Sequence, residues 1–309
     1  MKIAVTGANG FVARNLIRLL LEDTPAGDIR AIVRDIRRAL IELPAADLDV
    51  RAADVTRQYT LRGAFDGCEA VVHTVAIPTG GASALHEVNV RGTQNVVAEA
   101  ERAQIRRIVH MSILGADAES QFPYLRSKGL GERAVRSSAV PSVALRPSIL
   151  FGPGDDFFPR LGFTLRFPVV PVPGDGNARF QPLHVDDLAL VLRAALHRSD
   201  VFDVHEVGGH EAVTYDELLR ETMEGYGRRR PTVHLPVALM RPAAWLMQLV
   251  LPDPPVTPEQ LDLLKVDNVP NANAIEQVFG IRPRAFRGGL GYLRGSLKTS
   301  SPAPPAPLN

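Results

Sequence analysis

A tyrosine and a lysine four residues apart are the strongest candidates for chemistry in this sequence. Tyr124 and Lys128 lie in the segment YLRSK, and in a helix the i, i+4 spacing places both side chains on one face. A lysine ammonium beside a phenol lowers the phenol pKa, and the phenol can then pass a proton to or from a carbonyl or alcohol. The pair predicts a general acid/base, Tyr124, whose pKa is tuned by Lys128.

The choice of lysine at this position is informative. The chain has 35 Lys and Arg residues, of which only four are lysines: Lys2, Lys128, Lys265 and Lys298. An arginine-rich chain that uses lysine here indicates that an amine is needed. The alternative is an ordinary surface pair on a helix, with no catalytic consequence.

A glycine-rich turn near the N-terminus predicts a dinucleotide-binding site. Residues 6–13 read TGANGFVA, which gives the spacing Gly-x-x-Gly-x-x-Ala between an apolar strand and an amphipathic helix. Glycines allow a tight turn and a close approach to a pyrophosphate, and the helix N-terminus supplies free N–H groups. The alternative is a plain strand-to-helix turn.

The end of the second predicted strand favours NADP(H) as the cofactor, and NAD(H) stays the alternative. An acidic residue there would accept hydrogen bonds from the ribose 2′-OH, but the position holds Val33, and Arg34 follows it. The Arg34 guanidinium suits a 2′-phosphate, whereas Asp35 argues the other way. Alternatively, Arg34, Arg37 and Arg38 form a solvated helix face. Asp54 and Val55, after the third strand, are placed to meet the adenine.

Apolar strands and amphipathic helices alternate through the first half of the chain. Strands are expected over 3–6, 29–33, 49–53, 70–76, 107–113 and 142–150, and helices over 11–21, 84–102 and 124–138. This alternation predicts an α/β fold, a Rossmann doubly wound parallel sheet that binds ligand at the carboxyl ends of its strands.

After residue 151 the sequence becomes rich in proline and glycine, which predicts a smaller, mostly helical C-terminal lobe. Helices are expected near 157–165, over 184–197 and over 214–226, where Thr214 and Glu217 form a capping box. We therefore expect a Rossmann domain over 1–155 to which 180–208 returns, a substrate or partner lobe over 156–179 and 209–298, and a disordered tail over 299–309.

Composition narrows the class of protein. Among 309 residues the net charge is +1, which gives no indication of a nucleic-acid partner, and the single cysteine, Cys68, excludes a cysteine-based metal cluster; no metal is expected. The N-terminus has no signal-peptide pattern, so a cytoplasmic location is expected. The apolar stretch 235–251 is interrupted by Arg241 and Pro242, so no membrane span is expected. We expect it to form a buried or partner-packed helix pair, with peripheral membrane or protein docking as the alternative.

Several motifs together resemble the extended and atypical short-chain dehydrogenase/reductases, over residues 1 to about 294. They are the glycine turn, Asp54-Val55, HEVNVRGT at 86–93, Tyr124-x-x-x-Lys128, RPSILFGPG at 146–154 and HVDDLA at 184–189. The segments VHMSILGA at 109–116, FQPLHVDD at 180–187, TPEQ at 257–260 and LKVDN at 264–268 resemble the subgroup that includes the NAD(P)H-binding accessory subunit of respiratory complex I and bacterial nucleoside-diphosphate-sugar epimerase-like proteins.

The resemblance implies site residues beyond those already named. Gly7, Gly10, Phe11 and Val12 would bind the pyrophosphate; Val75 and Ala76 would line the cofactor; Asn89 would support the active-site lysine through water; and Pro147, Ser148 and Ile149 would pack on the nicotinamide side. The lysine of the motif would also bond the nicotinamide ribose. The family's catalytic Ser or Thr would fall near Leu114, and Ser112 lies two residues earlier.

Two functions follow from these expectations. The first is an NADP(H)-dependent oxidoreductase or sugar epimerase-like enzyme that moves a hydride between the nicotinamide and a carbonyl, alcohol or nucleotide-sugar-like substrate, with Tyr124, Lys128, Asn89 and Ser112 as catalytic residues. The second is a non-catalytic NAD(P)H-binding structural or redox-sensing module that docks on a larger complex. Leu114 at the hydroxyl position favours the second, and Tyr124 with Lys128 favours the first.

Overall fold

The computed structural model describes residues 1–250 and 256–295, which form two compact units. Unit 1 comprises 1–147, 185–207 and 270–283, and unit 2 comprises the described parts of 148–184, 208–269 and 284–309. The first boundary therefore lies at 147 and not at 155. Segment 270–283 belongs to unit 1, although the sequence assigned it to the C-terminal lobe. The expected tail lies outside the described residues.

Unit 1 consists of alternating strands and helices. They are β1 (Ile3–Thr6), α1 (Phe11–Leu20), η1 (Ala26–Asp28), β2 (Ile29–Val33), α2 (Ile36–Glu42), β3 (Asp49–Ala52), α3 (Gln58–Leu61), β4 (Ala70–His73), α4 (Ala82–Leu85), the π-helix η2 (His86–Arg91), α5 (Gly92–Arg102), β5 (Arg107–Met111), α6 (Pro123–Arg136), β6 (Ser142–Pro147), α8 (Val185–His197), β11 (Asp203–Val207) and α12 (Ala274–Gln277).

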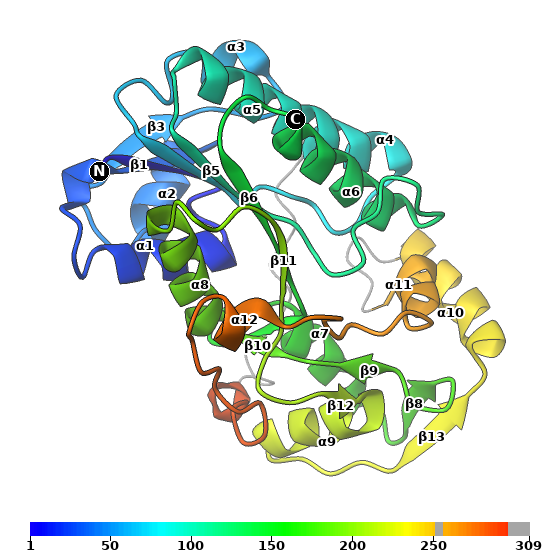
Figure 1. Cartoon of the computed structure of the whole chain (residues 1–309). Helices are drawn as coiled ribbons and strands as arrows, with labels where there is room; N and C mark the ends of the chain where they lie inside the picture. Colours follow the sequence, from blue (N-terminus) through cyan, green and yellow to red (C-terminus); the bar gives the residue numbers. More distant parts are fainter. Residues whose placement is uncertain (251–255, 296–309) are drawn as a thin grey trace. The chain divides into compact units, whose positions relative to one another are not determined.

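The strands form one seven-stranded parallel sheet in the order β11-β6-β5-β4-β1-β2-β3. Helices α1 and α8 pack together on one face of this sheet, and α5 and α6 pack together on the other (Figure 1). The strand order reverses between β1 and β4, because the chain runs outward from β1 to β3 and then crosses back. This reversal is the point where sheets of this type bind ligand, so the expected Rossmann fold is confirmed.

Predicted strands end earlier than expected, because strands end where their partners end. β4 stops at His73, which pairs with Thr6, the last residue of β1. The residues at 74–76 therefore form a loop beside the glycine turn. The helix expected over 84–102 is divided by the π-turn, and the strand expected over 142–150 stops at Pro147.

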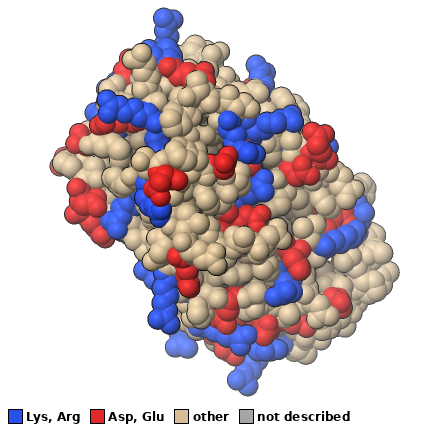
Figure 2. All heavy atoms as spheres, viewed as in Figure 1, with Lys and Arg blue, Asp and Glu red and all other residues tan. Residues whose placement is uncertain are grey.

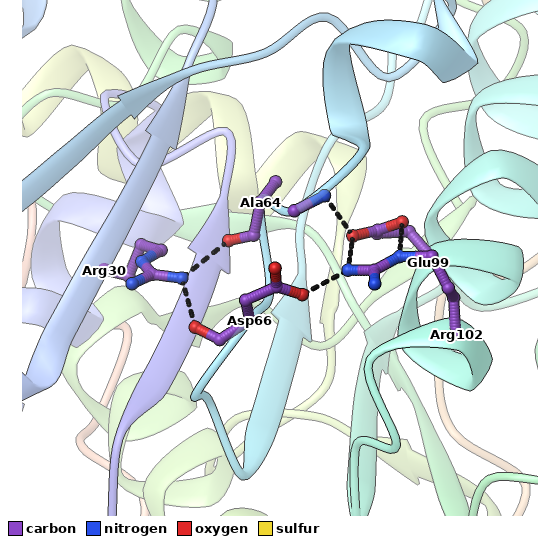
Figure 3. A network of polar contacts seen from close by, with 6 residues as sticks. Arg30, Ala64, Asp66, Glu99 and Arg102 are labelled. Carbon is purple, nitrogen blue, oxygen red and sulfur yellow. Dashed lines mark hydrogen bonds and ion pairs between the residues drawn. The ribbon is translucent and has the colours of Figure 1, made fainter.

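A buried arginine on β2 holds the turn between α3 and β4, which carries none of the sequence motifs. Arg30 on β2 is 5% exposed and donates to the carbonyls of Ala64, at 3.1 Å, and Asp66, at 2.7 Å. Glu99 of α5 accepts from the Gly63 N–H at 2.7 Å and pairs with Arg102 (Figure 3). These bonds satisfy the polar groups of the turn between α3 and β4, so the network has a structural role.

Unit 2 has shorter elements. They are β7 (Leu150–Phe151), α7 (Phe157–Phe163), η3 (Thr164–Arg166), β8 (Val170–Pro173), β9 (Arg179–Phe180), β10 (Leu183–His184), β12 (Val213–Thr214), α9 (Tyr215–Gly225), β13 (Thr232–Leu235), α10 (Val237–Val250), α11 (Pro258–Leu263) and η4 (Gly291–Leu293). Its core packs around Phe151, Phe158 and Phe286. The predicted capping box of Thr214 and Glu217 opens α9.

A buried carboxyl in unit 2 makes its stability depend on pH. Asp155 is 6% exposed, accepts from the Phe158 N–H at 2.8 Å and from the Tyr292 hydroxyl, and burial raises its pKa to about 6. Because the folded pKa exceeds the unfolded value of 3.8, the folded state favours the proton. The stabilisation is complete below about pH 4 and is lost as the pH rises through 6.

We expect Asp155→Asn to flatten this dependence, because the amide keeps an acceptor for Phe158 and does not ionise. Between pH 4 and pH 7, wild type should lose on the order of 2–3 kcal/mol more unfolding free energy than the variant, measured by urea denaturation. Asp47→Asn, at an exposed aspartate of unit 1, is the matched control. Equal pH slopes in the wild type and Asp155→Asn would contradict the expectation.

Candidate active site

The glycine turn forms a cradle at the point where the strand order reverses. Gly7 follows β1 with φ +66°, a left-handed conformation that favours glycine, and its carbonyl accepts from the Gly10 N–H at 2.8 Å. Helix α1 then begins at Phe11, and no side chain caps its N-terminus. The first-turn N–H groups of α1, including that of Val12, therefore lack a side-chain acceptor, as an anion-binding turn requires.

The loop after β4 packs against this cradle. A Cβ at Gly7 would lie 2.9 Å from Cγ2 of Val75 and 3.3 Å from Oγ1 of Thr74, and a Cβ at Gly10 would lie 3.0 Å from the Gly7 carbonyl oxygen. Only glycine fits these two positions without displacing a neighbour. Ala76 continues the same loop. The turn, the uncapped helix and the loop together fit the pyrophosphate of a dinucleotide. The hydrogen-bond donors that they offer to it are backbone N–H groups.

The acidic residue after β2 has a structural role. Asp35 is the N-cap of α2, and its carboxylate accepts from the Arg38 N–H at 3.2 Å. Arg34, one residue earlier, is exposed. Glu42 at the end of α2 accepts from the Asn9 amide of the glycine turn at 3.0 Å, so α2 and the turn are held together. The sequence analysis expected a helix here only as the alternative for Arg34, Arg37 and Arg38, and it missed this contact.

The residues expected near the adenine are held by α5. The Val55 carbonyl accepts from Asn95 at 2.8 Å, and a Cβ at Gly92 would lie 2.8 Å from Cγ2 of Val55. The Asp54 carboxylate accepts from the N–H and the hydroxyl of Thr56, at 2.9 and 2.8 Å. This turn is rigidly positioned at the carboxyl end of β3.

Helix α6 carries the tyrosine and the lysine, as the sequence predicts. Pro123 occupies its first turn, Tyr124 follows half-buried, and Lys128 is 3% exposed. The Lys128 ammonium donates to the Met111 carbonyl at the end of β5, at 2.7 Å. No hydrogen bond of the Tyr124 hydroxyl is found in the described part of the chain, so this oxygen can accept or donate a proton.

The protonation of this pair differs from the sequence expectation. Burial raises the pKa of Tyr124 to about 12, where the sequence analysis expected Lys128 to lower it. Burial also lowers the pKa of Lys128 to about 8, although Glu132 opposes this. At neutral pH the phenol therefore keeps its proton and the lysine keeps its charge.

Asn89 connects three parts of the candidate site. Its side chain bonds the N–H and the carbonyl of Ile77, at 2.9 and 3.0 Å, and donates to the Ser127 hydroxyl at 2.9 Å. Asn89 lies in the π-turn η2, a distortion that often occurs at functional sites. It fixes the loop after β4 to α6, one residue from Lys128.

The expected role of Ser112 is not supported by its position. Ser112 is 0% exposed, and its hydroxyl donates to Glu132 at 2.7 Å. Glu132 also accepts two hydrogen bonds from Arg146, each at 2.8 Å. Leu114 is buried. The Ser112 hydroxyl is thus engaged by the Glu132–Arg146 ion pair, and a role for it toward a substrate stays a prediction.

Two buried histidines that the sequence analysis did not single out lie behind the lysine. His73 shares hydrogen bonds with Thr6, at 2.8 Å, and Thr93, at 3.1 Å, and stacks on His110 with ring centroids 5.4 Å apart. Burial and the Lys128 charge lower the pKa of His73 to about 3 and that of His110 well below its usual range. Both rings are neutral, and they line one side of the buried lysine. The only sequence signal for these two histidines is their position at or near the carboxyl ends of β4 and β5.

The residues expected on the nicotinamide side fall in different units. Pro147 ends β6 in unit 1, and its carbonyl accepts from the Leu114 N–H at 3.2 Å. Ser148 and Ile149 belong to unit 2, where both bond Asn268: Ser148 through its hydroxyl, at 2.7 Å, and Ile149 through its N–H, at 2.8 Å. Their placement against a nicotinamide stays a prediction.

A glycine on α6 controls the position of the tyrosine and the lysine. A Cβ at Gly129 would lie 2.3 Å from the Ala118 nitrogen and from the Asp117 carbonyl carbon, both backbone atoms. We expect Gly129→Ala to displace α6 and to lower the unfolding free energy by about 2–3 kcal/mol, measured by chemical denaturation. Gly27→Ala, where a Cβ meets open space and the backbone is not left-handed, is the control for adding a methyl group to a glycine. A Gly129→Ala protein as stable as wild type would contradict the close contact.

Comparison with known proteins agrees with this geometry. Residues 7–156 match a family model described as NAD(P)H-binding. A ceramide reductase of Caulobacter vibrioides is 30% identical, over 76% of this chain and 73% of the relative. Subunit 9 of the NADH dehydrogenase [ubiquinone] 1 alpha subcomplex of Arabidopsis thaliana is 30% identical, over 61% of this chain and 50% of the relative.

The chain belongs to the extended and atypical short-chain dehydrogenase/reductases. The solved structure of an NADPH-dependent quinone oxidoreductase of Escherichia coli has a TM-score of 0.76 at 22% identity, covering 94% of this chain and 99% of that one. This likeness shows the fold. The family assignment and the cradle together make this chain an NAD(P)-binding protein of the oxidoreductase and epimerase type.

Proposed function

We propose that this protein is an NADP(H)-dependent oxidoreductase that acts on a carbonyl or alcohol substrate, with Tyr124 as general acid/base. The observation that carries the proposal is the placement of Tyr124 and Lys128 on one helix of the unit that holds the glycine cradle. When bound, the cofactor supplies or accepts the hydride.

The side chains have distinct roles in this proposal. Gly7, Gly10 and the first turn of α1 would hold the pyrophosphate. Tyr124 would hydrogen-bond the substrate oxygen and transfer the proton, because its hydroxyl has no other partner among the described residues. Lys128 would keep a positive charge beside the reacting oxygen below about pH 8. Asn89 would hold the loop and the helix in register.

The preference for NADP(H) rests on Arg34. Asp35, the residue that argued for NAD(H), is engaged in capping α2 and is a poor acceptor for a ribose hydroxyl in that state. The exposed Arg34 guanidinium is a suitable partner for a 2′-phosphate.

Cofactor binding tests this part of the proposal. We expect NADPH to bind more tightly than NADH, and Arg34→Ala to weaken NADPH binding by roughly tenfold, as the loss of a charge-assisted hydrogen bond predicts. NADH binding should stay unchanged, measured by fluorescence titration. Arg62→Ala, an exposed arginine after α3, is the matched control. If Arg34→Ala weakened NADPH and NADH binding equally, Arg34 would not be the residue that binds the 2′-phosphate.

The second candidate is a non-catalytic NAD(P)H-binding module. It is favoured by Leu114 at the expected hydroxyl position and by the burial of Ser112 against Glu132. A screen for NADPH oxidation with a 2-alkyl-3-oxoalkanoate, a quinone and a keto derivative of a nucleotide sugar separates the two. These probes are chosen because relatives and structural neighbours are named as a 2-alkyl-3-oxoalkanoate reductase, a quinone oxidoreductase and a dTDP-glucose 4,6-dehydratase. Turnover with one of them supports the enzyme, and cofactor retention without turnover supports the module.

A further inference from the structure

Helix α10 of unit 2 presents an apolar face that the unit does not cover. At 100° per residue, the exposed apolar positions of its described part share one arc, and they are Ala238, Leu239, Pro242, Ala243, Trp245 and Leu246. Arg241 and Gln248 are also exposed and lie next to this arc, on the side of Trp245. Leu239, Trp245 and Leu246 are 68%, 58% and 58% exposed. The opposite side of the helix, which includes Ala244, is buried or half-buried. The sequence analysis expected this stretch to be buried or packed on a partner; this chain does not bury the arc, and packing on a partner stays a prediction. Leu251, the end of the stretch, lies outside the described residues.

The arc carries no charge. Arg241 stands at its border and pairs with Asp262 of α11 at 3.1 Å. The space-filling view shows uncharged surface where the ribbon view places α10 (Figure 2). Exposed apolar surface of this kind on one helix indicates an interaction site.

The strand that leads into α10 extends the apolar surface. β13 pairs in parallel with β8, and the register sets Val233 opposite Pro171. Val170 and Val172 are buried, so the alternate residues Val169 and Val233 lie on the other face, where they are 43% and 42% exposed. An apolar ribbon face thus precedes the apolar helix.

A basic segment begins this ribbon. Arg228 and Arg229 are exposed in the turn that follows α9, and Arg230 donates to the Leu165 carbonyl at 3.3 Å. In η3, which precedes β8, the Arg166 guanidinium lies 5.0 Å from the centre of the Phe163 ring. Arginines beside exposed apolar and aromatic side chains complement a surface that is negative outside and apolar beneath.

We propose that this surface, formed by α10 and the β8–β13 ribbon with its arginines, binds an anionic lipid bilayer. Among the helices of residues 1–250 and 256–295, none combines the length and the hydropathy that a membrane crossing needs. The protein would lie on the bilayer with the α10 arc among the upper acyl chains and Arg228 and Arg229 at the headgroups. Trp245 lies toward the border of the arc, the position that indole side chains prefer at an interface.

The chain contains one tryptophan, so fluorescence reports on this surface alone. We would titrate the full-length protein with vesicles of about three parts phosphatidylcholine to one part phosphatidylglycerol, and with phosphatidylcholine alone. We expect a blue shift of Trp245 emission, quenching by lipids brominated on the acyl chains, and co-sedimentation that weakens with salt.

Paired variants divide the surface into its two parts. Leu239→Gln with Leu246→Gln should lower partitioning about tenfold or more, because two exposed leucines lose their apolar burial. Arg228→Ala with Arg229→Ala should lower binding to the anionic vesicles roughly tenfold and leave binding to neutral vesicles unchanged. Ile41→Gln, at an 86% exposed isoleucine of unit 1, is the matched control and should bind as wild type.

Two results would overturn the proposal. The first is Trp245 emission that neither shifts nor quenches with either vesicle. The second is a dimer in sedimentation analysis that Leu239→Gln with Leu246→Gln dissociates, since the arc would then be covered by a second copy. NADPH titration of the same variants keeps the two proposals apart, because the substitutions lie outside unit 1 and should not change cofactor binding.

Discussion

Tyr124→Phe is expected to lower kcat by about 10²–10⁴-fold while NADPH binding changes by less than about twofold. The substitution removes one oxygen, and among the described residues that oxygen makes no hydrogen bond whose loss would disturb the fold. Burial keeps the phenol protonated, with a pKa of about 12, so it is prepared to donate to a substrate carbonyl. Steady-state kinetics with the best substrate of the carbonyl screen gives the measurement.

Tyr59→Phe is the matched control, because Tyr59 is 75% exposed and lies in the short helix α3. It should turn over as wild type. A Tyr124→Phe enzyme that keeps full activity would assign the proton transfer to another group and would remove the central residue of the proposed function.

Lys128→Met is expected to abolish turnover and to raise the unfolding free energy at pH 7. Burial lowers the pKa of Lys128 from 10.5 to about 8, so keeping the charged amine in the fold costs on the order of 3 kcal/mol. Methionine has a similar length and no charge, and loss of the bond to the Met111 carbonyl offsets part of the gain. We expect a net stabilisation of about 1–2 kcal/mol by urea denaturation.

The pH dependence of wild type follows from the same group. Because the folded pKa lies below the unfolded one, the cost is complete below about pH 8 and disappears as the pH rises toward 10.5. Stability from this residue therefore increases with pH while activity decreases above pH 8, as the lysine loses its charge. Lys265→Met, at an exposed lysine, should change neither. A destabilised Lys128→Met protein would show that the hydrogen bond outweighs the burial cost.

The sequence was sufficient for the fold because local signals agree with the global topology. The buried strands of unit 1 are short apolar segments separated by amphipathic helices, and the glycine turn has the one spacing that its function requires. Tyr124 and Lys128 were found because their helical spacing is visible in the sequence. Each of these features is set by neighbours within a few residues.

What the sequence did not predict depends on contacts between distant segments. That Ser112 is bound to Glu132 follows from the packing of α6 on β5, and no local pattern indicates it. The raised pKa of Tyr124 has the same origin, since burial is a property of the assembled unit. The exposure of α10 was missed because an apolar helix reads the same whether or not other parts of the chain cover it.

Unit 1 is built from three separate stretches of the chain, so its last part can assemble only late in synthesis. Strand β11 lies at the edge of the sheet, and segment 270–283 lies beside it: the Asn271 N–H donates to Glu206 at 2.7 Å, and the Phe279 ring contacts His205. A ribosome must therefore make most of the chain before the last piece of the first unit emerges. Until then the outer edge of β11 lacks these contacts and is open to another extended strand, so we expect the nascent unit to be most prone to misassembly before residues 270–283 are made.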